Sequence, residues 1–519
     1  MVGGDLKFPE SVELRMNRDA QLCHDGTYRT RFGPCVEHNG VIYANSPHNL
    51  SLGLRRLTAA RFPEEPGKHQ EYMKRQGRFI RANQDFIKFL RELYAPIVGE
   101  FKDFYEEVRD HVSDPHPKKL LRENCYEELL ASGALHERFF GTRSVTYKTK
   151  KDEIAKAGKY IRLIGDMKVP ASLQGFVLTK LLKEAMSEVF VYEDCTFFFC
   201  AKPKTSALTY AFESLVSPPT VSFFVFFSDD SCYSRRNKDG SVSRYNVDIS
   251  TCDASHTKSL FEALASIVPS DCKLAMEELI GQCALPITVT SPANPRHKVK
   301  LRPKYPRLYS GSTLTTAINN LASMLIGLAL SRAATASEEN LMEAVATVGY
   351  VITLESCEKV EDLQFLKHSP CRDTRGIYRP LLNPGVLLRS SGCCKGDLPG
   401  RGDLQPRAEE FQRALLQGMY PRADFPLVRN MRRAVGGDAP FSDVMLEHAK
   451  KTGNLAYKVV EEEGETFHFS AEAVYRRYDL TSLDIALIDD EFATRGYRYF
   501  TANPSLSKIL EKDYGLKCL

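Results

Sequence analysis

The sequence has no hydrophobic run long enough for a membrane-spanning helix. Its longest apolar stretch, residues 321–330, is about half of the roughly 20 residues that such a helix needs. We therefore expect a buried helix there and no membrane span. Residues 1–13 mix charged and short apolar stretches and lack the hydrophobic core of a secretory signal, so we do not expect secretion.

Paired cysteine motifs and repeats are also missing. The 14 cysteines are scattered, none of them belongs to a CxxC pair, and only Cys393 and Cys394 are adjacent. This spacing argues against a zinc site and against a disulfide framework, and it predicts reduced thiols in a cytosol-like compartment. The chain also has no fixed-period repeat and no low-complexity tract.

An excess of charge of one sign is likewise absent. The 519 residues contain 70 Lys and Arg against 66 Asp and Glu, a formal net charge of +4. This balance by itself does not indicate a nucleic-acid-binding protein. With 26% charged and 43% hydrophobic residues the chain is expected to fold, and its length predicts about two to four subdomains.

What is present is an alternation of strand-like and helix-like segments between two helical ends. Aromatic and β-branched runs predict strands, and helical spacing of apolar residues predicts helices. The expected segments are strands at 195–200, 221–227 and 245–249, helices at 70–94, 171–190 and 259–267, a loop and long helix at 310–331, an exposed basic excursion at 286–306 and a hinge at 393–407. This pattern is typical of an α+β core with helical flanks.

Two acidic groups follow predicted strands. Asp248 and Asp253 are separated by four residues, and Asp229 and Asp230 come directly after the apolar run 223–227. A strand end holds a side chain rigidly, and carboxylate oxygens are the ligands that Mg²⁺ takes. Adjacent carboxylates repel each other, so their burial would require a cation. Taken alone, each group is more often a solvated turn.

A third group lies at the expected start of a helix. In the segment Ser310–Asn320, Thr315 and Asn319 are one turn apart and therefore lie on the same face. The small residues before them allow close approach of a backbone or a sugar. The alternative is a capped helix start with Ser310 or Thr313 as the cap. That alternative leaves the two asparagines at the end of the segment unexplained.

A basic stretch precedes all of these groups. Between Arg143 and Lys168 the chain has eight Lys and Arg against three Asp and Glu, a local excess of five. A solvated helix face is the usual origin of such a run. The apolar ending Tyr160–Ile164 predicts instead that part of it enters a strand.

Together these segments resemble the motifs of viral RNA-dependent RNA polymerases over about residues 145–395. Asp248-x4-Asp253 resembles motif A, and Ser310-Gly-x3-Thr315-x3-Asn319 resembles motif B. The remaining similarities are motif F at 151–162, motif D at 349–359 and motif E at 365–367.

The order of the motifs departs from the usual one. Motif C, an acidic pair, normally lies between motifs B and D, but residues 331–349 contain no Asp, and the Asp229–Asp230 turn precedes motif A. This order resembles the permuted polymerases typified by birnaviruses and permutotetraviruses. Ser228 stands where motif C most often has glycine. The permutation is physically reasonable because the strand ends need only converge in space.

The resemblance implies roles for individual residues in a two-metal nucleotidyl transfer. The implied catalytic residues are Asp248, Asp229, Asp230 and Lys359, and the metal ligands for Mg²⁺ or Mn²⁺ are Asp229, Asp230 and Asp248. The implied nucleotide-binding residues are Asp253, Ser310, Gly311, Thr315 and Asn319 around the ribose, with Lys159 and Arg162 at the triphosphate. The implied RNA-binding residues are Lys148, Lys150, Lys151, Lys156 and Lys367.

One of these residues and one neighbour have simpler interpretations. Lys359, the expected general acid for pyrophosphate, can also be a solvated lysine among Glu355, Glu358 and Glu361. For His256, just after motif A, we expect a packing or surface role.

The resemblance also implies a right-hand fold with fingers, a palm with an antiparallel sheet, a thumb and permuted palm connectivity. The expected domains are an N-terminal extension with part of the fingers (1–142), fingers with motif F (143–215), palm with motifs C and A (216–256), a fingers insertion (257–307), palm with motifs B, D and E (308–370) and thumb (371–519).

The implied function is RNA-dependent RNA synthesis that replicates and transcribes a viral RNA genome. The implied partners are template and nascent RNA, nucleoside triphosphates and other viral replication proteins, in a replication complex of the host cytoplasm or in the virion. Two alternatives stay open: a catalytically inactive, polymerase-like RNA-binding scaffold, and a reverse transcriptase. Asn319 and Asp253 argue against the latter, because they suit recognition of a ribose 2′-hydroxyl.

Overall fold

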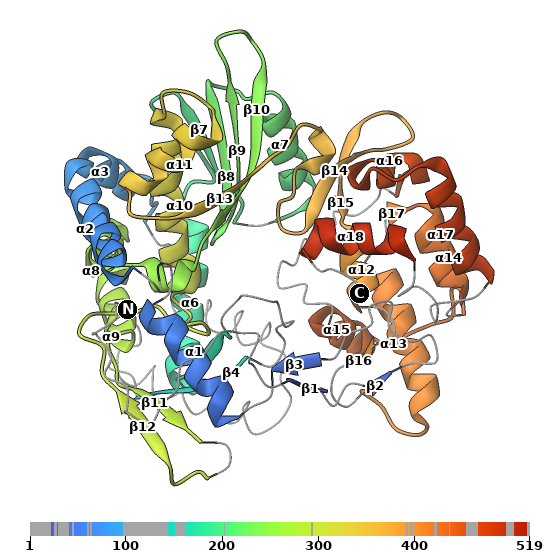
Figure 1. Cartoon of the computed structure of the whole chain (residues 1–519), viewed down its shortest axis with the longest axis horizontal. Coiled ribbons are helices and arrows are strands. Elements are labelled where there is room, and N and C mark those ends of the chain that lie inside the picture. Colours follow the sequence, from blue (N-terminus) through green and yellow to red (C-terminus); the bar gives the residue numbers. More distant parts are fainter. Residues whose placement is uncertain are drawn as a thin grey trace.

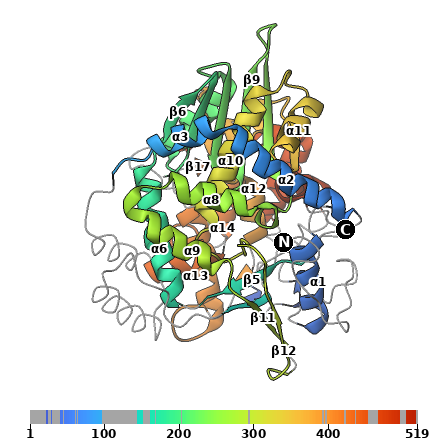
Figure 2. The same cartoon turned by 90° about the vertical axis from the view of Figure 1, so that its left-hand side faces the viewer.

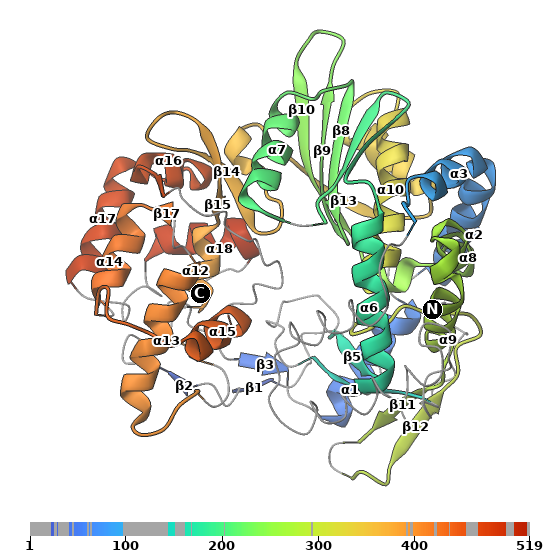
Figure 3. The ribbon, with the colours of Figure 1, turned by 180° about the vertical axis from the view of Figure 1, so that it is seen from behind.

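The structure is a computed structural model. It describes residues 22–24, 28–29, 41–43, 46–59, 62, 65–96, 144–150, 161–167, 169–201, 203–291, 294–390, 393–394, 398–419, 423–434, 436–452, 466–494 and 503–515. Figures 1, 2 and 3 show the arrangement of the elements from three sides.

Among the described residues, strands and helices alternate through the middle of the chain, and helices dominate the C-terminal part. The helices are α1 (Pro47–Ala59), α2 (Pro66–Ala82), α3 (Gln84–Glu92), α6 (Val169–Ala185), α7 (Thr205–Val216), α8 (Lys258–Ile267), α9 (Lys273–Gln282), α10 (Thr315–Arg332), α11 (Glu338–Thr347), α12 (Pro384–Ser390), α13 (Leu404–Met419), α14 (Pro426–Ala434), α15 (Asp443–Thr452), α16 (Ala471–Tyr475), α17 (Ser482–Thr494) and α18 (Pro504–Tyr514). Short 3₁₀ helices are η2 (Cys252–Ser255), η3 (Ser270–Cys272), η4 (Val360–Asp362) and η5 (Arg476–Tyr478).

The strands belong to a six-stranded sheet, a four-stranded sheet and several two-stranded pairs. They are β1 (Leu22–His24), β2 (Tyr28–Arg29), β3 (Val41–Tyr43), β4 (Val145–Thr149), β5 (Leu163–Asp166), β6 (Val189–Tyr192), β7 (Cys195–Phe199), β8 (Ser222–Phe227), β9 (Asp230–Arg236), β10 (Val242–Ile249), β11 (Ile287–Thr290), β12 (Lys298–Leu301), β13 (Ile352–Ser356), β14 (His368–Arg372), β15 (Tyr378–Leu382), β16 (Cys393–Cys394), β17 (Ala423–Asp424) and β18 (Phe467–His468).

The six-stranded sheet has the order β13-β10-β9-β8-β7-β6. Its neighbours are antiparallel except for β7 and β8, which are parallel. The strands in the segments expected to form the palm, β8, β9, β10 and β13, are antiparallel to one another as neighbours, as expected. The parallel pair arises where β7, from the segment expected in the fingers, joins β8. The reason is the connection: α7 joins β7 to β8, and a helical crossover returns the chain to the same end of the sheet.

Both faces of this sheet are covered, which explains the unbroken aromatic run of β8. Phe224 and Phe226 belong to the large core that contains α10, whereas Phe223 and Val225 belong to the smaller core that contains α7. Successive side chains of a strand point to opposite faces, so a strand buried on both sides has no polar positions. Figures 1 and 3 show α10 and α7 on the two opposite faces.

The apolar stretch 321–330 forms the centre of α10 and is buried, as the sequence predicts. Helix α10 packs closely on the sheet at Gly327, where a Cβ atom would lie 2.7 Å from the rings of Phe197 and Phe224. In the described part of the chain no helix is both long and apolar enough to cross a membrane.

The C-terminal unit, residues 371–515, has a hydrophobic core of its own. This core includes Phe411, Phe425, Tyr475 and Leu510 and is separate from the two cores around the large sheet. In Figure 1 its helices α12–α18 lie together, in orange and red, beside the six-stranded sheet. The predicted domain boundaries stay predictions.

Three expectations about regular structure need correction. The helix predicted over 171–190 ends at Ala185, because Phe190 belongs to β6 and stacks on Phe197 across the strand pair at 5.0 Å. The N-terminal region is not wholly helical, since β1 pairs with β3. The hinge predicted at 393–407 begins with β16, which pairs with β2. The partners of the last two segments are distant in the sequence or were not recognised as strands.

Other predicted elements are confirmed. Strands β7, β8 and β10 and helices α8 and α10 lie where the sequence predicts them. The helix predicted over 70–94 consists of α2 and α3, which are separated at Asn83.

Candidate functional site

The acidic pair lies at the tip of a β-hairpin. Strand β8 ends at Phe227, which is paired with Asp230, so Ser228 and Asp229 form a two-residue turn. Ser228 has φ of +56°, a left-handed conformation that is favourable for glycine. This explains in physical terms why glycine is common at this point of the motif that the sequence resembles.

The register of the sheet brings Asp248 to the same place. Asp248 in β10 is the direct cross-strand neighbour of Asp230 in β9. Directly opposed residues have Cα atoms about 4.5–5.5 Å apart and project their side chains from the same face of the sheet. Asp229 is next in the chain. Three carboxylates from two separate motifs therefore meet at one end of the sheet.

Asp230 is held by the charges and the backbone around it. Burial is the largest cause that raises its pKa to about 7, and the negative charges of Asp229 and Asp248 add to this increase. Two contacts lower the pKa of Asp230. The backbone N–H of Leu366 donates to Asp230 Oδ2 at 2.9 Å, and Lys367 contributes a positive charge. Leu366 and Lys367 both have positive φ, at 51° and 61°. Asp230 thus also anchors a strained turn.

The raised pKa of Asp230 predicts a pH dependence of stability in metal-free buffer. The ordinary pKa of the group is 3.8, so between about pH 4 and pH 7 the folded protein holds a proton that the unfolded chain has lost. The free energy of unfolding contributed by this group therefore falls as pH rises through that range. We expect wild type to lose stability relative to Asp230→Asn between about pH 4 and about pH 7 in chemical unfolding experiments. If the difference in free energy of unfolding between wild type and Asp230→Asn did not change with pH, the raised pKa of Asp230 would be contradicted.

Helix α10 fixes the turn at Ser228 by three hydrogen bonds. Asn320 Oδ1 accepts from the Ser228 backbone N–H at 2.7 Å, and Ser323 Oγ donates to the Ser228 carbonyl at 2.6 Å. Asn319 Nδ2 donates to Ser228 Oγ at 3.2 Å. The helix of motif B thereby holds the acidic turn in position, which accounts for two asparagines in an otherwise apolar helix.

A buried chain of hydrogen bonds orients Asn319. His256 Nε2 lies 2.7 Å from Asn319 Oδ1, and His256 Nδ1 lies 2.9 Å from the Tyr350 hydroxyl. Because a carbonyl oxygen only accepts, Nε2 carries the proton and Nδ1 accepts from Tyr350. This arrangement leaves Asn319 Nδ2 for Ser228. His256 is fully buried, so its expected surface role is wrong and a packing role is right. Asn319 is also buried, and its predicted contact with a ribose stays a prediction.

Asp253 connects the acidic site to basic residues. It lies in η2, just after β10, and burial followed by the charge of Asp229 raises its pKa. The positive charges of Arg162, Arg56 and Lys150 act in the opposite direction. Arg162 is exposed at the start of β5. The predicted triphosphate-binding Arg162 is therefore brought to the predicted ribose-binding Asp253.

The small residues before α10 serve close packing of two backbones. The Ser310 carbonyl accepts from the Gly165 N–H of β5 at 2.8 Å. Gly311 has φ of +99°, and a Cβ atom there would lie 2.6 Å from the Gly165 carbonyl oxygen. The Thr315 hydroxyl donates to the Ser312 carbonyl at 2.7 Å. Just before the helix, Ser312 Oγ accepts from the Leu314 N–H at 3.2 Å. Neither of the expected caps, Ser310 and Thr313, caps α10, because its N-cap residue is Leu314 and has no side-chain cap bond.

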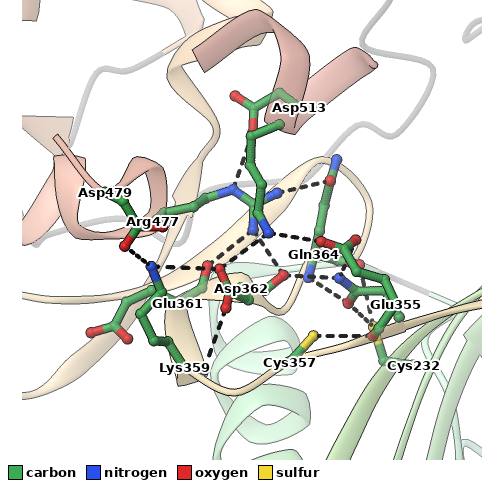
Figure 4. Close-up of polar contacts among 12 residues, drawn as sticks. Cys232, Glu355, Cys357, Lys359, Glu361, Asp362, Gln364, Arg477, Asp479 and Asp513 are labelled. Carbon is green, nitrogen blue, oxygen red and sulfur yellow. Dashed lines mark hydrogen bonds and ion pairs between the residues drawn. The ribbon is translucent and has the colours of Figure 1, made fainter. Parts of the chain in front are cut away.

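The structure places Lys359 and Lys367 against the C-terminal unit. Lys359 Nζ donates to the Arg476 carbonyl at 3.0 Å and pairs with Asp479, as Figure 4 shows. Lys367 Nζ donates to the Asp513 carbonyl at 2.9 Å and lies 4.5 Å from the centre of the Tyr514 ring. Both ammonium groups are thus bound within the protein. Acting as a general acid or as an RNA contact would require these bonds to break.

The predicted RNA-binding lysines are only partly within the described residues. Lys148 is exposed on β4, 3.9 Å from Asp166, and Lys150 follows it with its backbone N–H bonded to the Arg162 carbonyl. Lys151, Lys156 and Lys159 lie outside the described residues.

Sequence reasoning missed several residues of the site. Arg56 of α1 acts on Asp253 from a distant part of the chain, and Lys183 of α6 lies 5.2 Å from the Phe227 ring beside the turn. Burial lowers the pKa of Lys183. The Leu366 N–H and Ser323 complete the contacts of the hairpin. The two asparagines of α10 were the one visible signal, since polar residues inside an apolar helix require partners.

The three aspartate carboxylates are suitable ligands for a divalent cation because of their chemistry and because they lie near one another. Mg²⁺ and Mn²⁺ take oxygen ligands, which Asp229, Asp230 and Asp248 supply. A cation there would offset the repulsion that raises the pKa of Asp230. Among the described residues no group of three or more His, Cys, Asp or Glu side chains is already arranged to hold a metal ion. The aspartate side chains would therefore have to turn toward a common point.

Comparisons with known proteins find similarity to solved structures. No protein-family model and no curated protein matches the sequence. Two similar solved structures are the birnavirus VP1–VP3 complex and the RNA polymerase VP1 from Infectious Pancreatic Necrosis Virus. Each comparison gives a TM-score of 0.39 and 12% identity and covers 68% of this chain and 48% of the other. The chain thus spans about half the length of the chains it matches.

Proposed function

We propose that the protein is an RNA-dependent RNA polymerase that replicates and transcribes a viral RNA genome. One observation carries this proposal: the register of β9 and β10 places Asp230 directly beside Asp248, with Asp229 in the adjoining turn. Two acidic motifs thus meet at one sheet end although their order in the chain is permuted. In this proposal the six-stranded sheet is the palm, the C-terminal unit is the thumb, and the four-stranded sheet belongs to the fingers.

Asp229, Asp230 and Asp248 would hold Mg²⁺ or Mn²⁺. When bound, the cations would supply charge stabilisation for the attacking 3′-hydroxyl oxygen and for the pyrophosphate that leaves. Other residues around the carboxylates would bind and orient the substrates. Arg162 and Lys150, together with Lys159, would neutralise the triphosphate, because phosphoryl transfer depends mainly on positioning and charge.

Recognition of the ribose would fall to Asp253 and Asn319. Asp253 lies between the acidic turn and the basic residues, and its carboxylate can accept a hydrogen bond from a 2′-hydroxyl. Asn319 is oriented by His256 and lies beside Ser228. A ribose that replaced the Ser228 hydroxyl as the partner of Asn319 Nδ2 would be selected over a deoxyribose.

The proposal includes partners and a location. The substrates are an RNA template, the nascent strand and nucleoside triphosphates. Further viral replication proteins would bind the chain in a replication complex of the host cytoplasm or in the virion.

Primer extension on a defined RNA template tests the function. We expect the purified chain to add ribonucleotides as the template directs, to stop when the divalent cation is chelated, and to resume when Mg²⁺ or Mn²⁺ is added back. Deoxyribonucleotides should be used at least about 10-fold less efficiently, because a hydrogen bond to the 2′-hydroxyl is lost. Equal use of deoxyribonucleotides would instead identify a reverse transcriptase. RNA binding without any incorporation would identify an inactive scaffold.

A further inference from the structure

The four-stranded sheet has one buried face and one open face. Its order is β12-β11-β4-β5. The residues of one face are buried, among them Val145, Tyr147, Val289 and Leu301. Because side chains alternate along a strand, the residues between them lie on the opposite face. That face carries Thr146, Lys148, Thr288, Thr290, Lys298 and Lys300 and, from β5, Ile164 and Asp166; in the described structure all eight are exposed or half-buried.

The register joins these residues into rows across the sheet. Thr288 is the direct neighbour of Lys300 on one side and of Thr146 on the other, and Thr290 is the neighbour of Lys298. Lys298 and Lys300 are two residues apart in one strand, so their ammonium groups leave the same face about 7 Å apart. The face therefore alternates ammonium groups with threonine hydroxyls, both of which donate hydrogen bonds to phosphate oxygens.

Positive charge on this face is nearly unopposed. Residues 286–309 contain six Lys and Arg and no Asp or Glu. Arg296, Arg302 and Lys304 are exposed next to β12, whereas Arg307 is buried. Within the described part of the chain Lys298 and Lys300 form no ion pair, while Lys148 lies 3.9 Å from Asp166. An exposed pair at that distance contributes little, so it leaves the face basic.

The same face leads to the candidate site. Beyond Lys148, strand β4 continues to Lys150, whose N–H is bonded to the Arg162 carbonyl. The charges of Lys150 and Arg162 act on Asp253, and Asp253 lies beside Asp229. Strand β11 runs parallel to β4, so the turn of the β11–β12 hairpin lies at the same end of the strands as Lys150, on the side of the sheet away from β5. The hairpin projects from the body of the molecule, as Figures 1 and 2 show. A ligand bound along the face would run from the projecting hairpin to the carboxylates.

We infer that this open face binds the sugar–phosphate backbone of single-stranded RNA, the template strand on its way to the carboxylates. This inference rests on the proposed function, because the bound RNA is a template only if the protein is a polymerase. A basic surface with hydroxyl donors suits a phosphate chain, and the exposed ring of Tyr305 offers a surface on which a base can stack. An anionic membrane would also attract the charges. RNA is favoured over a membrane because the basic face leads to Arg162 and Asp253, and a template strand has to reach the acidic turn beside them.

Binding of a fluorescent single-stranded RNA to the full chain, without metal or nucleotide, tests the inference. The variant Lys298→Ala/Lys300→Ala should weaken binding about tenfold or more at moderate salt. It should also reduce the slope of log affinity against log salt by about 1.4, because each phosphate contact on a single strand contributes about 0.7. The matched control Lys74→Ala/Lys88→Ala removes the same charge from exposed positions of α2 and α3. It should leave the affinity within about twofold and the slope unchanged, because it removes no phosphate contact.

The outcomes separate this inference from the proposed function. Equal weakening by both variants would mean a long-range charge effect and would overturn the assignment of the face. Unchanged RNA binding with loss of binding to vesicles of anionic lipid would identify a membrane surface instead. Weakened RNA binding by a chain that never extends a primer would support the face and contradict the polymerase. Since both lysines are exposed, the variant should have the same thermal unfolding temperature as wild type. This measurement serves as the check that the variant is folded.

Discussion

Replacing Asp248 by asparagine is expected to lower nucleotide incorporation by about 10³-fold or more while the protein stays folded. Asp248 is exposed at the end of β10, and asparagine has the same size. The substitution removes one of the charges that oppose ionisation of Asp230. The proposed cation, by contrast, loses a carboxylate ligand. Loss of one preorganised charged group in an active site costs at least about this factor.

Two further variants make the experiment decisive. Asp239→Asn is the matched control, because Asp239 is an exposed aspartate in the turn between β9 and β10 and bonds only locally to Ser241. It should retain wild-type incorporation. Asp229→Ala should be as inactive as Asp248→Asn, since its carboxylate belongs to the same cluster. If Asp229→Ala retained activity, the identification of the 228–230 turn as motif C would be wrong.

Replacing Asp513 by alanine is expected to lower the free energy of unfolding by about 3–5 kcal/mol. Asp513 and Arg477 form an ion pair at 3.1 Å, and both side chains are almost entirely buried. Asp513 also accepts from the Gly385 N–H at 2.9 Å and from the Tyr478 hydroxyl at 2.7 Å. Removing one partner of a buried pair leaves the other charge uncompensated, and that is the costly case.

The structural consequence would reach the candidate site. Figure 4 shows the Arg477 guanidinium donating to the carbonyls of Glu361 and Asp362 and to the Gln364 side chain. This segment leads directly to Leu366, whose N–H holds Asp230. The buried pair therefore joins the C-terminal unit to the turn beside the carboxylates.

The neighbouring residue offers a matched control for stability. Lys512 pairs with Glu355 at 2.8 Å and with Asp362 at 3.2 Å; Asp362 is buried, but Lys512 and Glu355 are partly exposed. Lys512→Ala should cost at most about 1 kcal/mol, as for other solvent-accessible pairs. Chemical unfolding followed by circular dichroism measures both variants. Similar losses for Asp513→Ala and Lys512→Ala would show that burial does not set the strength of this junction.

Local sequence patterns were sufficient for much of the large sheet and for its central helix. A run such as 223–227 is too short and too apolar for anything but a buried strand, and the charged pair after it must leave the core. The apolar stretch 321–330 similarly required a helix buried on all sides. These features follow from side-chain hydrophobicity and period, which act over a few residues and are therefore visible in the sequence.

The sequence by itself also determined which chemical groups are available: two acidic motifs, a basic stretch, and a pair of asparagines in an apolar helix. Only the tertiary structure decided how they meet. The register that places Asp230 beside Asp248, the three bonds from α10 to Ser228 and the His256–Asn319 contact all join segments far apart in the chain. Lys359, expected at the reaction, and Lys367, expected to contact RNA, both bind to the C-terminal unit. Such contacts depend on the packing of whole elements, and no local pattern of residues encodes them.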